Sequence, residues 1–199
     1  MSRIRGLIAM VGALAVVNTA SATIINLSDA SSDDTPFSLL TATMGFEVVG
    51  DMLTLTVTNT TADPNAYKIN ELYFNGPDGV TLSFAGLAGW SDATNAMVGG
   101  FGTFDFALLD GQGGSPNQIT AGETVVFMFT ITAGTADKDG FVTALSEPTG
   151  GGTGWLVAAK FVEGPGDDSA FGAAIPTPGV LALLGAAGLV GSRRRRRRA

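Results

Sequence analysis

The chain has 199 residues, no cysteine and no histidine, and its 18 acidic side chains outnumber its 11 basic ones. The missing residues exclude disulfides, a Ser-His-Asp triad and the histidine ligands of most catalytic zinc sites. Eight basic residues are arginines at the two ends, which leaves Lys68, Lys138 and Lys160 against 18 acids; the resulting net charge of −15 excludes nucleic acid as a partner.

The first 22 residues have the three zones of a secretory signal peptide. Arg3 and Arg5 precede an apolar run over 7–17, and the small-residue step of Ala20 and Ala22 follows. The apolar run would cover only about 16 Å as a helix, which is too short for a stable membrane anchor. We therefore expect a signal helix over 1–22, handled by the Sec translocon and cut by signal peptidase after Ala22.

Between residues 23 and 163, the stretch predicted to form the domain, several short runs alternate between apolar and polar side chains with period two, which is typical of half-buried strands. In Leu53–Thr58 two leucines and a valine share one face and three threonines the other, and Thr124–Thr132 repeats the pattern. The remaining candidate strands are 23–27, 37–42, 46–49, 69–74, 80–84, 104–108, 141–145 and 155–162. The fold predicted is all-β: one antiparallel two-sheet β-sandwich, jelly-roll or immunoglobulin-like, flanked by the signal helix and a C-terminal hydrophobic helix.

Turn-forming residues separate these runs. Asn75–Gly79 predicts a short hairpin loop, and Asp92–Met97 predicts a single helical turn. Between 164 and 174 the glycine, acid and alanine content predicts a flexible spacer.

Calcium is the one cofactor that the acidic composition suggests, but the sequence predicts no cofactor. Asp137, Asp139 and Gly140, with Glu147 downstream, approach the calcium loop of an EF-hand, but its first and twelfth positions fall on other residue types. A solvated turn is the favoured interpretation. The other acidic candidates are Asp29, Asp33, Asp34, Asp167 and Asp168.

The sequence offers only weak candidate residues for catalysis and for stacking on sugars. A carboxylate pair could hydrolyse glycosides, and Glu71 and Asp105 lie in predicted strands. Nothing in their spacing distinguishes them from surface acids, so no catalytic residue is assigned and the protein is expected not to be an enzyme. Aromatic side chains could form a stacking platform for sugars; Trp90 is the one expected to be exposed, and the others are Trp155, Tyr67 and Tyr73.

The last 25 residues, 175–199, have three parts in order. Pro176, Thr177 and Pro178 precede a charge-free apolar run over 180–192, and a block of arginines ends the run. That block costs several kcal/mol to carry into hydrocarbon, so it is expected to stay on the cytoplasmic side of a transiently inserted helix. The arginines are Arg193, Arg194, Arg195, Arg196, Arg197 and Arg198.

This tail resembles the PEP-CTERM sorting signal, with Thr177 at the position where the family name has glutamate. The resemblance implies processing near the proline motif by an exosortase, a membrane-embedded transpeptidase. It also implies a cell-surface or extracellular-matrix location, in association with extracellular polysaccharide. We therefore expect an exported, exosortase-sorted surface or matrix protein without enzymatic activity; a secreted carbohydrate- or calcium-binding β-sandwich module is the alternative.

Overall fold

The computed structural model describes residues 22–29, 40–62, 67–110, 117–148, 154–164 and 169–174. Most of the predicted signal peptide and the whole sorting tail lie outside these residues, as do Asp33, Asp34, Asp167 and Asp168. The predicted flanking helices therefore stay predictions. Within the described part, no helix is both long enough and apolar enough to cross a membrane.

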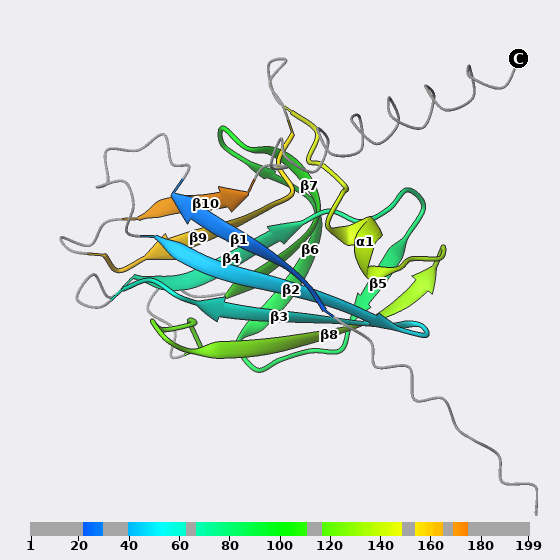
Figure 1. Cartoon of the computed structure of the whole chain (residues 1–199), viewed down its shortest axis with the longest axis horizontal. Helices are drawn as coiled ribbons and strands as arrows, with labels where there is room; N and C mark the ends of the chain where they lie inside the picture. The colour runs from blue at the N-terminus through cyan, green and yellow to red at the C-terminus, as the bar shows by residue number, and fades with distance from the viewer. Residues whose placement is uncertain are drawn as a thin grey trace, which may run out of the picture.

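The described residues form an all-β structure in which every strand pair is antiparallel (Figure 1). One helical turn, α1 (Lys138–Phe141), follows the eighth strand. The strands are β1 (Thr23–Asp29), β2 (Thr41–Val49), β3 (Met52–Asn59), β4 (Lys68–Phe74), β5 (Thr81–Phe84), β6 (Trp90–Val98), β7 (Gly102–Asp110), β8 (Thr124–Ala133), β9 (Val157–Val162) and β10 (Ala170–Ala174).

These ten strands belong to one continuous sheet in the order β5-β8-β3-β2-β1-β10-β9-β4-β7-β6. The sheet curls into a nearly barrel-shaped body, so that strands far apart in this order face each other across the core. Phe74 of β4 lies 5.6 Å from Phe129 of β8 and 5.8 Å from Phe46 of β2, measured between ring centroids. The prediction of an all-β domain is confirmed, with a single curled sheet where two sheets were expected.

Alternation explains which side chains enter the core. In β3, Leu53, Leu55 and Val57 are completely buried, while the threonines between them are only half-buried. Inward burial of apolar side chains at about 25 cal/mol per Å² is the main favourable term that holds such a sheet closed. A chain without disulfides depends on this term throughout.

A second, smaller apolar cluster lies on the other side of the sheet. Tyr73 faces away from the neighbouring core residues Leu72 and Phe74, and it packs with Phe104 and Ala158 of the adjoining strands. Phe101 and Trp155 cover this outer cluster, with ring centroids 5.1 Å apart. The curled sheet is therefore buried on both faces around β4 and β9.

Three local predictions are wrong. Asn75–Gly79 is not a hairpin loop, because β4 pairs with β7 and β9 whereas β5 pairs with β8. Asp92–Met97 is part of strand β6, and Phe141 ends the helical turn α1 rather than beginning a strand. In each segment a partner distant in sequence, or the cap at Asp137, decides the conformation.

The predicted spacer over 164–174 contains β10. This strand pairs with β1 on one side and with β9 along its whole length on the other. Its small side chains, Ala170, Ala173 and Ala174, are buried. The alanine and glycine content that indicated a flexible spacer instead belongs to a strand packed between two others.

Candidate functional site

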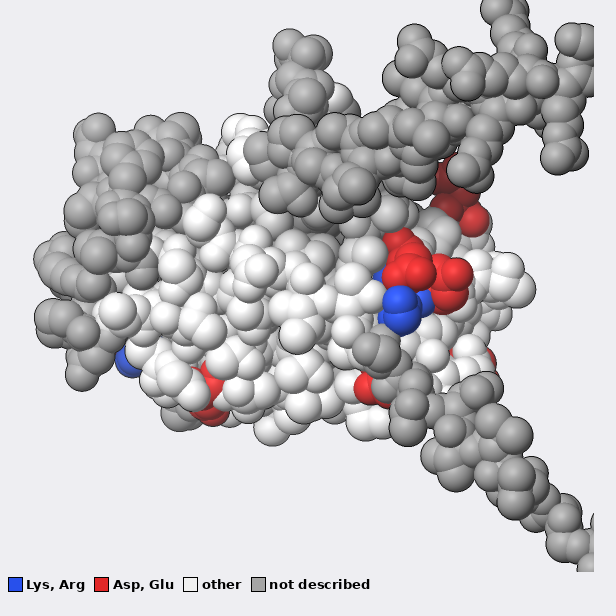
Figure 2. All heavy atoms as spheres, viewed as in Figure 1, with Lys and Arg blue, Asp and Glu red and all other residues white. Residues whose placement is uncertain are grey.

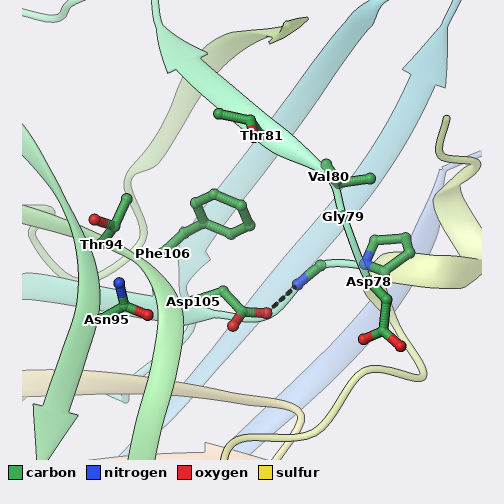
Figure 3. A pocket seen from close by; sticks show the side chains of 10 residues that line it. Asp78, Gly79, Val80, Thr81, Thr94, Asn95, Asp105 and Phe106 are labelled. Carbon is green, nitrogen blue, oxygen red and sulfur yellow. Dashed lines mark hydrogen bonds between the residues drawn. The ribbon is translucent and has the colours of Figure 1, made fainter. Parts of the chain in front are cut away.

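A polar pocket with a volume of about 350 Å³ opens beside Asp105 (Figure 3). Three parts of the chain line it: the 76–80 loop with the start of β5, the middle of β6, and Asp105 with Phe106 from β7. The side chains that give it its chemistry are Asp78, Thr81, Thr94, Asn95 and Asp105, over the ring of Phe106.

Asp105 is fixed by the loop that follows β4. Its Oδ2 accepts a hydrogen bond of 3.0 Å from the backbone N–H of Gly76, and its own N–H donates to Asn75 Oδ1 at 3.2 Å. Asn75 is itself buried and donates through Nδ2 to the carbonyl oxygens of Trp155 and Leu156, at 3.2 and 3.3 Å. These hydrogen bonds connect the loop after β4, strand β7 and the segment before β9 around the Asn75 side chain. They hold the Asp105 carboxylate at the pocket wall.

The remaining wall is set by backbone constraints. A Cβ on Gly76 would lie 3.0 Å from the Phe106 ring, so a larger residue would require this ring to shift by a few tenths of an ångström. Asn95 has a φ of 53°, a left-handed conformation that asparagine tolerates better than most residues. It lies opposite Asp105 in the β6–β7 register, between the pairs Thr94–Phe106 and Ala96–Phe104.

The electrostatics of the pocket disfavour an anionic ligand. Two carboxylates line it, and none of the three lysines is among its lining residues. Lys68 is bound to Glu163, Lys138 to Asp139 at 2.6 Å, and Lys160 to Glu71 at 2.9 Å. Figure 2 shows few charged side chains over β1 to β3, with a mixed acidic and basic group at α1. Carboxylate and amide acceptors with threonine hydroxyls over an aromatic ring suit a neutral polyhydroxylated ligand.

The carboxylate pair considered for catalysis is not brought together. Glu71 pairs with Leu109 in the β4–β7 register, four residues along β7 from Asp105. At about 3.3 Å per residue the two positions are roughly 13 Å apart, beyond the spacing that glycosidase carboxylates use. Glu71 instead accepts hydrogen bonds from Lys160 and from the Tyr73 hydroxyl. Burial, and then the Glu71 carboxylate, raise the pKa of Tyr73 well above its ordinary value.

The four aromatic side chains considered for sugar stacking do not form an exposed platform. Trp90, expected to be exposed, is 7% exposed and packs in the core, with its Nε1 donating to the Asn117 carbonyl at 3.1 Å. Tyr67 and Tyr73 are buried, and Trp155 covers the outer cluster. The exposure prediction for Trp90 is therefore wrong, because its ring packs against Phe127 of β8 across the core.

The Asp137–Gly140 motif is a helix cap. Asp137 Oδ1 accepts a hydrogen bond of 2.9 Å from Gly140 N and begins α1, a standard N-cap contact. Asp139 accepts from Lys138, and this bond lowers the pKa of the Asp139 carboxyl. Glu147 lies elsewhere, in a backbone bridge with Thr103. No group of three or more acidic residues in the described ranges is arranged to hold a metal ion.

Sequence reasoning missed most of the pocket. It named Asp105, but Thr94 and Asn95 fell in the segment expected to be helical, and Asp78 fell in a loop assigned to a hairpin. The proline and glycines of the turn before the short strand at 80–84 were the only local sequence signal for the pocket.

Comparison of the chain with protein-family models, with curated proteins and with solved structures found no match.

Proposed function

We propose that this chain is an exported, exosortase-sorted protein of the cell surface or extracellular matrix, without enzymatic activity. The observation that carries the proposal is the three-part tail over 175–199, together with the signal-peptide pattern over 1–22. Sec translocon, signal peptidase and exosortase would handle the two ends in turn. The tail would span the inner membrane only transiently, and the acidic domain would remain outside.

The strand boundaries are consistent with this processing. β1 begins at Thr23, directly after the predicted cleavage site, and β10 ends at Ala174, two residues before Pro176. Removal of both end segments would leave every described strand and its pairing complete. We also propose that two walls of the curled sheet pack face to face as a sandwich, supported by the contacts of Phe74 with Phe129 and Phe46 across the core.

Mass spectrometry of the protein from its native host tests the proposal. We expect Thr23 as the N-terminus and a C-terminus near Pro176–Pro178, without the arginine block. Replacement of Ala20 and Ala22 by leucine should retain the N-terminal segment, and Pro176→Ala with Pro178→Ala should retain the tail. A full-length cytoplasmic species as the functional form would refute the assignment.

The Asp105 pocket favours a second candidate function, the binding of a neutral polysaccharide. Its acceptors, hydroxyls and aromatic floor match the groups that hold sugars. We expect Asp105→Ala to weaken polysaccharide retention at least tenfold in affinity electrophoresis. Asp92→Ala is the matched control, because Asp92 is exposed on the same β6–β7 pair but does not line the pocket. Equal retention by both variants would exclude the pocket as the binding site.

A further inference from the structure

Three buried polar side chains lie at one end of the sheet, away from the pocket. Asp110, Asn70 and Gln118 are 7%, 7% and 3% exposed. Both carboxylate oxygens of Asp110, the Asn70 amide oxygen and both side-chain atoms of Gln118 have no hydrogen-bond partner in the described structure. Five such atoms in one region are unusual, because buried polar groups in native proteins are almost always paired.

The strand register brings these residues together. Glu71 and Leu109 are the last registered pair of β4 with β7, so Asn70 and Asp110 each follow one position further along. Ile69 forms a bridge with Ile119, which places Gln118 beside the same end of β4.

The backbone around them is firmly held. Reciprocal hydrogen bonds of 3.0 and 2.9 Å join Ile69 and Ile119. Asn59 Nδ2 donates to the Ile119 carbonyl at 2.9 Å, and Trp90 Nε1 holds the Asn117 carbonyl. A β-bulge between Ile69 and Glu71 inserts Asn70 as an extra residue, and such bulges often re-aim a side chain next to functional sites.

Alternation indicates the direction of two of the side chains. Asp110 has the parity of Phe106 and Leu108 in β7, and Asn70 that of Leu72 and Phe74 in β4; these four neighbours are core residues. Asp110 and Asn70 therefore face the enclosed side of the sheet. A buried carboxylate without a partner is strongly destabilising, so a nearby cation would stabilise it.

The domain between the two end segments has no spare basic side chain for Asp110. Residues 23–174 contain three basic side chains, Lys68, Lys138 and Lys160. Each is bound to a different carboxylate, Glu163, Asp139 and Glu71 respectively. Within residues 23–174 the compensating charge therefore has no side-chain source, which favours an ion from solution.

We propose that Asp110, Asn70 and Gln118 bind a divalent cation, with calcium as the ion that fits best. All the candidate ligand atoms are oxygens, which hard cations prefer, and calcium commonly combines carboxylate with amide carbonyl ligands. The second Asp110 oxygen remains able to accept a hydrogen bond from Gln118 Nε2. The negative field of the −15 domain raises the local concentration of such ions. This site does not depend on the cellular address proposed above.

Thermal melting of the purified full chain tests the site. Calcium at a hundred times its dissociation constant should raise Tm by about 5–10 °C relative to excess chelator. Asp110→Asn should abolish this shift, and in chelator it should melt no lower than the wild type because it removes an uncompensated charge. The double variant Asp78→Asn with Asp105→Asn, which alters the pocket carboxylates, should keep the full shift.

Terbium luminescence gives a second measurement that needs no change at Asp110. Trp90 is the register partner of Asp110, whereas Trp155 accepts a hydrogen bond from Asn75 at the opposite end of β4, roughly 17 Å from Asn70. Indole-sensitised terbium emission, displaced by calcium, should persist in Trp155→Phe and fall at least fivefold in Trp90→Phe.

Two results would overturn the proposal. The first is the absence of both a calcium-dependent Tm shift and terbium emission. The second is a shift that Asp110→Asn leaves intact, which would locate the ion elsewhere.

Discussion

Trp90 and Phe127 contact edge to face with ring centroids 5.0 Å apart, although their strands lie near opposite edges of the sheet. β6 is one edge strand, and β8 is next to the other edge strand, β5. This contact therefore helps to close the curled sheet. Contacts between neighbouring strands cannot close the sheet in this way, because they do not connect its two edges.

Replacement of Trp90 should test that closure. Trp90→Ala removes a large core side chain and the hydrogen bond to the Asn117 carbonyl, and should cost about 3–5 kcal/mol of unfolding free energy. Trp90→Phe keeps most of the ring contact and should cost about 1–2 kcal/mol. Urea denaturation measures both, and equal small losses would show that the contact does not hold the edges together.

Asn59 should be among the most sensitive polar positions. Its amide donates to the carbonyls of Tyr67 and Ile119, at 2.8 and 2.9 Å, and its Oδ1 accepts from Thr61 N at 3.1 Å. Because Asn59→Ala removes three buried hydrogen bonds to backbone groups, it should cost about 3–5 kcal/mol in urea denaturation. Asn26→Ala, at an exposed position of β1, should change the free energy by less than about 0.5 kcal/mol.

Tyr73 should make the protein sensitive to alkali. Its pKa is raised in the folded state by burial and by Glu71, so folding favours the neutral phenol. This contribution is complete below the unfolded pKa of about 10, and above it stability should fall by up to about 1.4 kcal/mol per pH unit. Denaturation between pH 9 and 11 should show a smaller alkaline slope in Tyr73→Phe than in the wild type. Identical slopes would contradict the prediction.

Gly102 and Gly100 form a matched pair for backbone strain. Both have positive φ, 92° and 80°, but a Cβ on Gly102 would lie 2.2 Å from the Glu147 carbonyl oxygen, while Gly100 faces open space. Gly100→Ala should therefore cost only about 1 kcal/mol. Gly102→Ala should cost clearly more, because the Thr103–Glu147 bridge must move. Comparable thermal midpoints for the two variants would show that this bridge adapts without cost.

The sequence by itself was enough to predict the strands that have one apolar face and one polar face. Leu53–Thr58 alternates strictly between apolar and polar residues because β3 has one face in the core and one toward solvent. In Thr124–Thr132 the inward positions are likewise all apolar, although Val126 and Met128 are exposed on the outward face of β8. The chemical limits set by the missing cysteine and histidine were also fixed at that level. The expected signal peptide and sorting tail also rest on the sequence alone, because the order of charged and apolar residues can be read directly from it.

Tertiary structure decided what depends on partners far apart in the chain. β6 has a mostly exposed pattern because it is an edge strand, and β10 is made of small residues because it lies between β1 and β9. The Asp105 pocket joins a loop, β6 and β7, and the Asp110 cluster joins residues 70, 110 and 118 through strand register. Alternation specifies which face a side chain occupies, but only the pairing of distant strands specifies which other side chains share its surroundings.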